Sequence, residues 1–175
     1  ELANYIYQNT QTENNNKPYT IKDALALCEE TLKNYPNTEG AKNCATLKEH
    51  IYFKNISITT EETVIPNQNF KALVHYKNVD KIYLKIVPIN YADRETLFAQ
   101  KDKETQDDII KRLNAIKALK IWNQALPVAD DFLDHTTEIK IDGLKNGYYA
   151  VLVSTTPNFT VVAGKEAISI VTLFS

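Results

Sequence analysis

Apolar side chains recur every three or four residues in the first part of the chain and every second residue in most of the remainder. The first spacing places side chains on one face of a helix, and the second places them on one face of a strand. The period changes near Lys54. The pattern therefore predicts an α+β protein, with a helical region over residues 1–53 and a β-rich region over residues 54–175.

Two amphipathic helices are predicted on either side of Pro36. Thr20 and Asp23 have the spacing of a capping box at the start of the first helix, and Pro36 ends it because proline cannot continue a helix. Thr38 is suited to cap the second helix. The predicted apolar stripes are Ile21, Leu25, Cys28 and Leu32 in the first helix and Ala41, Cys44, Leu47 and Ile51 in the second.

The short connection between these helices predicts an antiparallel hairpin. Residues 1–8 are typical of the end of a further helix. A hairpin alone buries little apolar surface, so its stripe is expected to pack on residues 1–8, on the β-rich region or on neighbouring repeats. The chain opens at Glu1 and contains no Met, which favours a piece of a longer protein.

The β-rich region predicts roughly seven antiparallel strands in an immunoglobulin-like sandwich of two sheets. The strands that flank Asn78–Asp80 are expected to pair with each other as a hairpin. One helix, over about residues 104–119, interrupts the strands, and its charges run from acidic to basic as the helix dipole favours. The expected strands contain Ile56–Ile58, Phe70–Tyr76, Ile82–Ile89, Lys120–Leu126, Thr136–Asp142, Gly147–Thr156 and Ala167–Phe174.

Cys28 and Cys44 lie at similar distances on either side of the predicted hairpin turn, both on the apolar stripe. Antiparallel helices would bring them to similar heights. A disulfide there would close a loop of roughly 15 residues and contribute about 3 kcal/mol of stability. The alternative is two buried thiols that pack as small hydrophobic groups. The sequence leaves both open.

Trp122 and Tyr149 are the structural side chains that stand out in the β-rich region. The segment Leu144-Lys-Asn-Gly147-Tyr-Tyr149 is typical of a tyrosine corner, in which a buried tyrosine hydroxyl bonds to upstream backbone. Trp122 is expected to anchor the core of the sandwich, so that its truncation to alanine would cost about 3 to 5 kcal/mol.

Composition and motifs give no support for catalysis or a cofactor. The net charge of −2 provides no basic patch for nucleic acid, and no apolar run reaches the roughly 18 residues that span a bilayer. No nucleophile elbow, phosphate-binding loop or metal-ligand spacing occurs. The densest acidic cluster, Asp130, Asp131, Asp134 and His135, lacks the glycine and spaced oxygens of a calcium loop and is interpreted as a solvated loop.

Several stretches, in their order along the chain, resemble the N-terminal region of bacterial alpha-2-macroglobulin-like proteins. Asn34–Lys42 looks like the turn of a tetratricopeptide-like helical pair. The stretches that resemble a macroglobulin-type sandwich domain are Ile65–Val74, Tyr76–Leu84, Trp122–Leu126 and Leu144–Tyr149. The resemblance implies a piece of a large periplasmic, cell-envelope or secreted protein that traps proteases by means of a cleaved bait segment and a reactive thioester.

The thioester of that family needs a glutamine three residues after its cysteine. Here Thr31 follows Cys28 at that spacing and Leu47 follows Cys44, so neither cysteine matches. The resemblance therefore implies a non-catalytic structural and interaction module. Its expected partners are neighbouring domains of the parent protein and the proteases that the parent traps.

The alternative hypothesis is a carbohydrate- or ligand-binding sandwich module of a surface or secreted protein. Exposed, coplanar aromatic rings would favour it, and the candidates are Tyr83, Tyr91 and Tyr148. An enzyme is the hypothesis with the least support.

Overall fold

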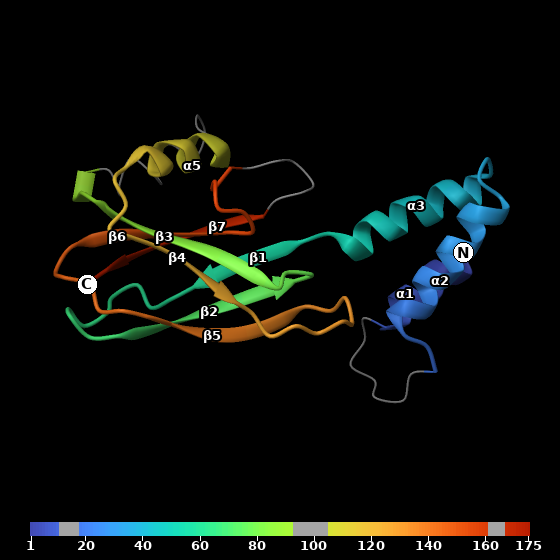
Figure 1. Ribbon diagram of the computed structural model, residues 1–175, viewed down its shortest axis with the longest axis horizontal. Helices are drawn as coiled ribbons and strands as arrows, with labels where there is room; N and C mark the ends of the chain where they lie inside the picture. The colour runs from blue at the N-terminus through green and yellow to red at the C-terminus, as the bar shows by residue number, and fades with distance from the viewer. Residues whose placement is uncertain (11–17, 93–104, 161–166) are drawn as a thin grey trace. The chain divides into compact units, whose positions relative to one another are not determined.

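A computed structural model describes residues 1–10, 18–92, 105–160 and 167–175. The chain divides into two compact units. The first is helical and comprises residues 1–53 together with residues 129–133, and the second comprises residues 54–128 and 134–175. Figure 1 gives the labels of the helices and strands.

The helical unit contains α1 (Leu2–Thr10), α2 (Ile21–Asn34) and α3 (Glu39–Tyr52). The predicted caps are confirmed. Thr20 and Asp23 form a capping box, in which the Thr20 N–H donates to Asp23 Oδ2 at 2.6 Å. This bond lowers the pKa of Asp23. The Ala41 N–H donates to Thr38 Oγ1 at 3.2 Å at the start of α3.

Apolar stripes of all three helices meet in one core. α2 packs against both α1 and α3, which satisfies the stripe that a two-helix hairpin would leave exposed. Nothing in the sequence pattern indicated that residues 129–133 would join this unit, but Phe132 packs edge-on against Tyr52 with ring centroids 5.3 Å apart. The buried members of this core are Ile6, Tyr7, Ile21, Ala24, Leu25 and Ile51.

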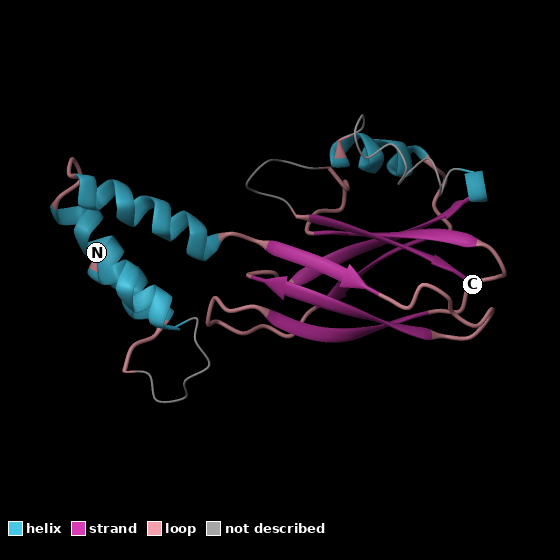
Figure 2. Ribbon diagram, turned by 180° about the vertical axis from the view of Figure 1, so that it is seen from behind, coloured by secondary structure: helices cyan, strands magenta, loops and turns pink. Residues whose placement is uncertain are grey.

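The second unit is a sandwich of two antiparallel sheets, which confirms the predicted α+β fold class (Figure 2). One sheet has the order β1-β2-β5, and its strands are Asn55–Thr59, Phe70–Lys77 and His135–Ile141. The other has the order β4-β3-β6-β7, with strands Lys120–Ala125, Lys81–Ile89, Tyr148–Ser154 and Ile168–Phe174.

The alternating apolar positions of both sheets face a shared core, as their period of two predicted. Ile82, Leu84 and Ile86 of β3 are fully buried there, opposite the inner face of β2. The other strands contribute Ile56, Ile58, Ala72, Val74, Tyr76, Ile139, Ile141, Tyr149, Val151 and Val153.

The predicted hairpin between β2 and β3 is wrong. β2 pairs with β1 and β5, whereas β3 pairs with β4 and β6, so the connection Asn78–Asp80 carries the chain from one sheet to the other. Asn78 adopts a positive φ of 54°, which asparagine tolerates better than most residues, and Val79 is buried in the core. Periodicity shows which face of a strand is buried but not which strand it pairs with, so a short link can join two strands across the core.

The predicted helix over residues 104–119 is shorter in the structure, where α5 spans Gln106–Ala115. Thr105 and Asp108 form its capping box. The chain leaves the helix at Ile116, and the Leu119 N–H donates to the Ile86 carbonyl oxygen at 2.8 Å. Leu119 is 59% exposed rather than part of the apolar face, because the ladder with β3 draws this segment into an extended conformation.

α5 covers the outer face of the sheet that contains β3 and β6 (Figure 1). Its Leu113 is buried against a second apolar cluster on that face, with Ile109 and Ile116 half-buried beside it. The middle strands of this sheet, β3 and β6, are therefore covered on both sides. The fully or largely buried strand residues of the cluster are Val87, Ile89, Ala150 and Leu152.

Candidate functional site

The sheet edges at β1 and β7 bond to each other and to the segment that follows β1. The Ile58 N–H donates to Ser169 Oγ at 3.1 Å, which links β1 to β7. Farther along β7, the Phe174 N–H donates to the Glu62 carbonyl oxygen and the Val64 N–H donates to the Phe174 carbonyl oxygen, both at 2.8 Å. These bonds close this side of the sandwich.

β4 and β5 are the remaining edge strands, and each pairs with one strand only. The Lys120 ammonium at the start of β4 forms an ion pair with the Asp142 carboxylate, which directly follows β5. This contact lowers the pKa of Asp142. The same ammonium lies 5.0 Å from the centre of the Trp122 ring, so two contacts hold it at one end of the edge.

β4 presents an open row of backbone groups. The Leu126 N–H donates to the Asp80 carbonyl oxygen at 2.8 Å, and antiparallel ladders alternate residue by residue. Ile121, Asn123 and Ala125 therefore direct their N–H and C=O groups away from β3. Their side chains are exposed and uncharged, and Ile121 is 60% exposed.

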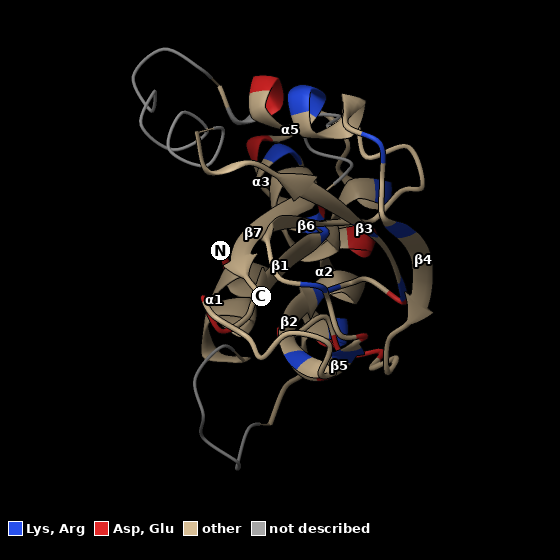
Figure 3. Ribbon diagram, turned by 90° about the vertical axis from the view of Figure 1, so that its left-hand side faces the viewer, with Lys and Arg blue, Asp and Glu red and all other residues tan. Residues whose placement is uncertain are grey.

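β4 carries its charge at its first residue, Lys120, whereas the charged side chains of β5 lie farther along the strand. Thr136, Glu138 and Lys140 are the exposed positions of β5. Figure 3 colours the basic and acidic residues along the ribbon. Glu138 also forms an ion pair with Lys71 of β2 at 2.6 Å. Charged side chains on an edge strand discourage the addition of another strand. Among the described residues, β4 is thus the edge most suited to pair with another chain, and we take it as the candidate site.

Trp122 is placed on this edge strand rather than at the centre of the sandwich. It pairs across the sheet with the fully buried Leu84 and packs, half-buried, against the main core. An edge strand has a neighbour on one side only, so part of its indole remains exposed. The indole therefore takes part in both the core and the open edge.

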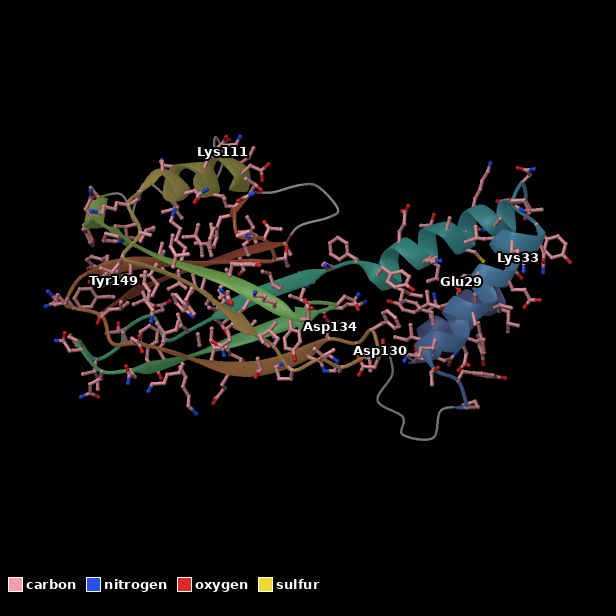
Figure 4. The ribbon with its side chains drawn as sticks, viewed as in Figure 1. Glu29, Lys33, Lys111, Asp130, Asp134 and Tyr149 are labelled. Atoms are coloured by element: carbon pink, nitrogen blue, oxygen red, sulfur yellow. The ribbon has the colours of Figure 1, made fainter. Side chains whose placement is uncertain are left out.

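Tyr149 has the geometry expected of a tyrosine corner. Its side chain is buried, and its hydroxyl donates to the Lys145 carbonyl oxygen at 2.9 Å (Figure 4). A Cβ at Gly147 would lie 3.4 Å from the same hydroxyl oxygen. Gly147 also has a φ of 158°, which side-chain-bearing residues rarely adopt. This corner fixes the start of β6, and its tyrosine ring belongs to the core of the sandwich.

Cys28 and Cys44 lie together between α2 and α3, and both are free thiols. Cys28 is completely buried and Cys44 is half-buried. Burial, with a hydrogen bond to Cys44 as a second cause, raises the pKa of Cys28 to about 12. The structure thus brings together the two cysteines that the sequence placed at similar heights.

The aromatic residues considered for carbohydrate binding do not form a flat platform. The rings of Tyr91 and Tyr148 lie 5.6 Å apart and are tilted by 57°, and those of Tyr148 and Phe174 lie 4.7 Å apart at 48°. Tyr83 is half-buried against the cluster beneath α5, with the Lys81 ammonium 5.4 Å from its ring. None of these pairs is coplanar.

The acidic cluster of the β4–β5 connection is divided between the two units. Asp130 binds the Lys22 ammonium at 2.5 Å and Asp131 Oδ1 accepts the Leu133 N–H at 3.0 Å, all within the helical unit. Asp134 and His135 belong to the sandwich. Within the described ranges, no three His, Cys, Asp or Glu side chains are grouped so as to hold a metal ion.

Lys85 is a buried charged residue that was not among the sequence-based predictions. It lies on β3 beneath α5, and its ammonium donates to two oxygens of Asn114. Burial lowers the pKa of Lys85. A lysine inside the apolar run Ile82–Ile89 was the available signal, but its partner at the end of α5 is 29 residues away in sequence.

The described helices include none that is long and apolar enough to cross a membrane. No protein-family model matches the chain, and no curated protein matches it. Solved structures show a distant similarity to immunoglobulin-like sandwich domains.

One of these is the CARDB domain of a Pyrococcus furiosus protein, with 12% identity, a TM-score of 0.37, and coverage of 70% of this chain and 94% of that chain. Another is native alpha-2-macroglobulin from Escherichia coli spanning domains NIE-MG1, with 11% identity and a TM-score of 0.37. That match covers 70% of this chain and 61% of the other. The similarity is one of distant fold, and it assigns neither activity nor partner to this chain.

Proposed function

We propose that this chain is a non-catalytic interaction module of a larger, alpha-2-macroglobulin-like protease-trapping protein of the periplasm or cell envelope. In this proposal, a neighbouring domain of the parent protein docks on β4. The macroglobulin part rests on the sequence resemblance. The observation that supports docking is the open, uncharged edge at Ile121, Asn123 and Ala125.

The chemistry of β4 favours the addition of an extended segment of a partner. The outward N–H and C=O groups of Ile121, Asn123 and Ala125 would continue the ladder, and main-chain bonds of this kind supply affinity in strand addition. Ile121 on one face and the exposed part of Trp122 on the other would supply apolar contact. The partner segment is expected to be apolar at alternate positions and to carry no positive charge opposite Lys120.

The contacts of Lys85 support a non-catalytic role. The Lys85 ammonium, the buried basic group on β3, is bound by two oxygens of Asn114. The sequence also lacks the glutamine that a thioester at either cysteine would need. The tilted rings of Tyr91 and Tyr148 lend no support to a flat carbohydrate platform.

Hydrogen exchange on this chain alone and on the full-length parent tests the docking. In the isolated chain, the amides of Ile121, Asn123 and Ala125 should exchange quickly because they point away from β3, whereas the Leu126 amide is bonded to Asp80. In the parent protein the first three should become protected by about tenfold or more. Equally fast exchange in both proteins would rule out strand addition on β4.

A charge placed on the edge provides the second arm of the test. Ile121→Lys should weaken binding of this chain to the separately expressed remainder of the parent by about tenfold, which is about 1.4 kcal/mol. Thr136→Lys on β5 is the matched control, because Thr136 is also exposed on an edge strand. Equal losses from both variants, or no loss from either, would contradict a specific role of β4.

A further inference from the structure

The two thiols of the helical unit occupy unlike environments. Cys28 of α2 is completely buried, whereas Cys44 of α3 is half-buried. α2 and α3 pack against each other, and Cys44 is one of the groups that raise the pKa of Cys28, so the two thiols are neighbours. Cys28 lies eight residues before Pro36 and Cys44 eight residues after it, so the hairpin itself sets this meeting.

A positive charge lies close to the thiol pair. Lys48 follows Cys44 by four residues on α3, which places both on one side of the helix. Its ammonium bonds to Glu29 Oε1 at 2.8 Å, and Glu29 directly follows Cys28 on α2 (Figure 4 labels Glu29). The ammonium favours the thiolate form of Cys28, although burial and Cys44 outweigh it.

We propose that Cys28 and Cys44 are a reversible disulfide site that links α2 to α3, in which Cys44 meets the oxidant and Cys28 resolves the intermediate. The order follows from access, because a disulfide molecule in solution can approach a half-buried thiol but not a completely buried one. Lys48 is a positioning residue, which holds positive charge beside the sulfur atoms as they become thiolates.

The oxidant is a low-molecular-weight disulfide, such as oxidised glutathione. The Cys44 thiolate attacks one sulfur of the oxidant, forms a mixed disulfide and releases one thiol. Cys28 then loses its proton and attacks Cys44 Sγ, which forms the protein disulfide and releases the second thiol. Two protein thiols are oxidised, the oxidant is reduced to two thiols, and the two protons lost by the protein are taken up by those thiols.

The link would close the connection that contains Pro36 and Thr38. A disulfide restricts the unfolded chain and so favours the folded hairpin. Three short helices bury a small core, so their stability would respond strongly to such a link. The redox potential of the compartment would then determine the stability of the hairpin.

Oxidised glutathione and the native chain provide the test. Tryptic mass spectrometry without reductant should find the Cys28 and Cys44 peptides joined within one chain, with the loss of two hydrogens. The melting temperature of the helical unit, followed by circular dichroism, should rise by about 5 °C or more. Two free thiols after prolonged oxidation, or links only between chains, would overturn the proposal.

Single variants separate the two roles. Cys28→Ser should accumulate a glutathione adduct on Cys44, whereas Cys44→Ser should remain unmodified while folded, because Cys28 is buried. Equal adduct formation in both variants would contradict the assigned order. Helical circular dichroism before each reaction confirms that the variant is folded.

Lys48→Gln tests the positioning role. This variant should form the disulfide in the native state about threefold or more slowly than the wild-type protein at pH 7.5. The difference between the two proteins should shrink at high salt, because salt screens the Lys48 charge of the wild-type protein. Lys42→Gln, at an exposed position on the same helix, is the control. Equal rates in wild-type and Lys48→Gln proteins would remove Lys48 from the mechanism.

Discussion

The Lys85 ammonium donates to the Asn114 carbonyl oxygen at 2.7 Å and to Asn114 Oδ1 at 2.8 Å. Asn114 lies in the last turn of α5, where carbonyl groups lack partners within the helix and the dipole favours a cation. Lys85 is buried on the outer face of β3. A strand residue thus fixes the end of the helix that covers its sheet.

Lys85→Ala should destabilise the protein by about 2 kcal/mol, because it removes two charge-assisted hydrogen bonds and leaves the half-buried oxygens of Asn114 without this donor. Urea unfolding, monitored by circular dichroism, measures the loss. Lys140→Ala, at an exposed position on β5, should have little effect. If Lys85→Ala unfolds at the same urea concentration as the wild-type protein, the contact with Asn114 does not stabilise the position of α5.

The same lysine predicts a pH dependence. Burial lowers the pKa of Lys85 in the folded protein below its ordinary value of 10.5. As the pH rises through the interval below 10.5, the folded protein gives up this proton before the unfolded chain does, so stability rises with pH. The free energy of unfolding of the wild-type protein should therefore increase relative to Lys85→Met as the pH rises toward 10.5. A decrease in this free-energy difference as the pH rises would mean that folding raises the pKa of Lys85 instead of lowering it.

Tyr149→Phe should cost about 1 kcal/mol, since it removes the bond to the Lys145 carbonyl oxygen without removing the ring from the core. Thermal unfolding of the sandwich measures the change. Tyr83→Phe is the control, because the described contacts of Tyr83 involve its ring rather than its hydroxyl. Equal costs for the two variants would mean that the corner bond contributes nothing specific.

Trp122→Ala should cost about 1 to 3 kcal/mol, less than the 3 to 5 expected for a fully buried indole, because an edge strand leaves the ring half-exposed. Leu84→Ala, at its fully buried cross-strand partner, should cost at least as much despite the smaller side chain. Denaturant unfolding of both variants checks the order. A larger loss at Trp122 would identify it as a core anchor after all.

The local features of the fold could be predicted because neighbouring residues determine them. The capping box at Thr20 and Asp23 and the cap at Thr38 satisfy backbone groups within one helical turn. The corner from Lys145 to Tyr149 spans four residues, and the buried faces of the strands follow from alternation. The candidate edge at β4 could not be found in this way, because an edge is defined by the absence of a neighbour in the finished sheet.

The sequence by itself therefore determined the helical and β-rich regions, the helix caps, the buried strand faces and the tyrosine corner, which all depend on contacts within a few residues. Only the tertiary structure decided that β2 and β3 lie in different sheets, that α5 ends at Ala115, and that Lys85 binds Asn114. The physical reason is that an alternating strand satisfies its burial equally well on either side of a shared core. Which strands pair, and which edge stays open, is settled by the packing of distant segments.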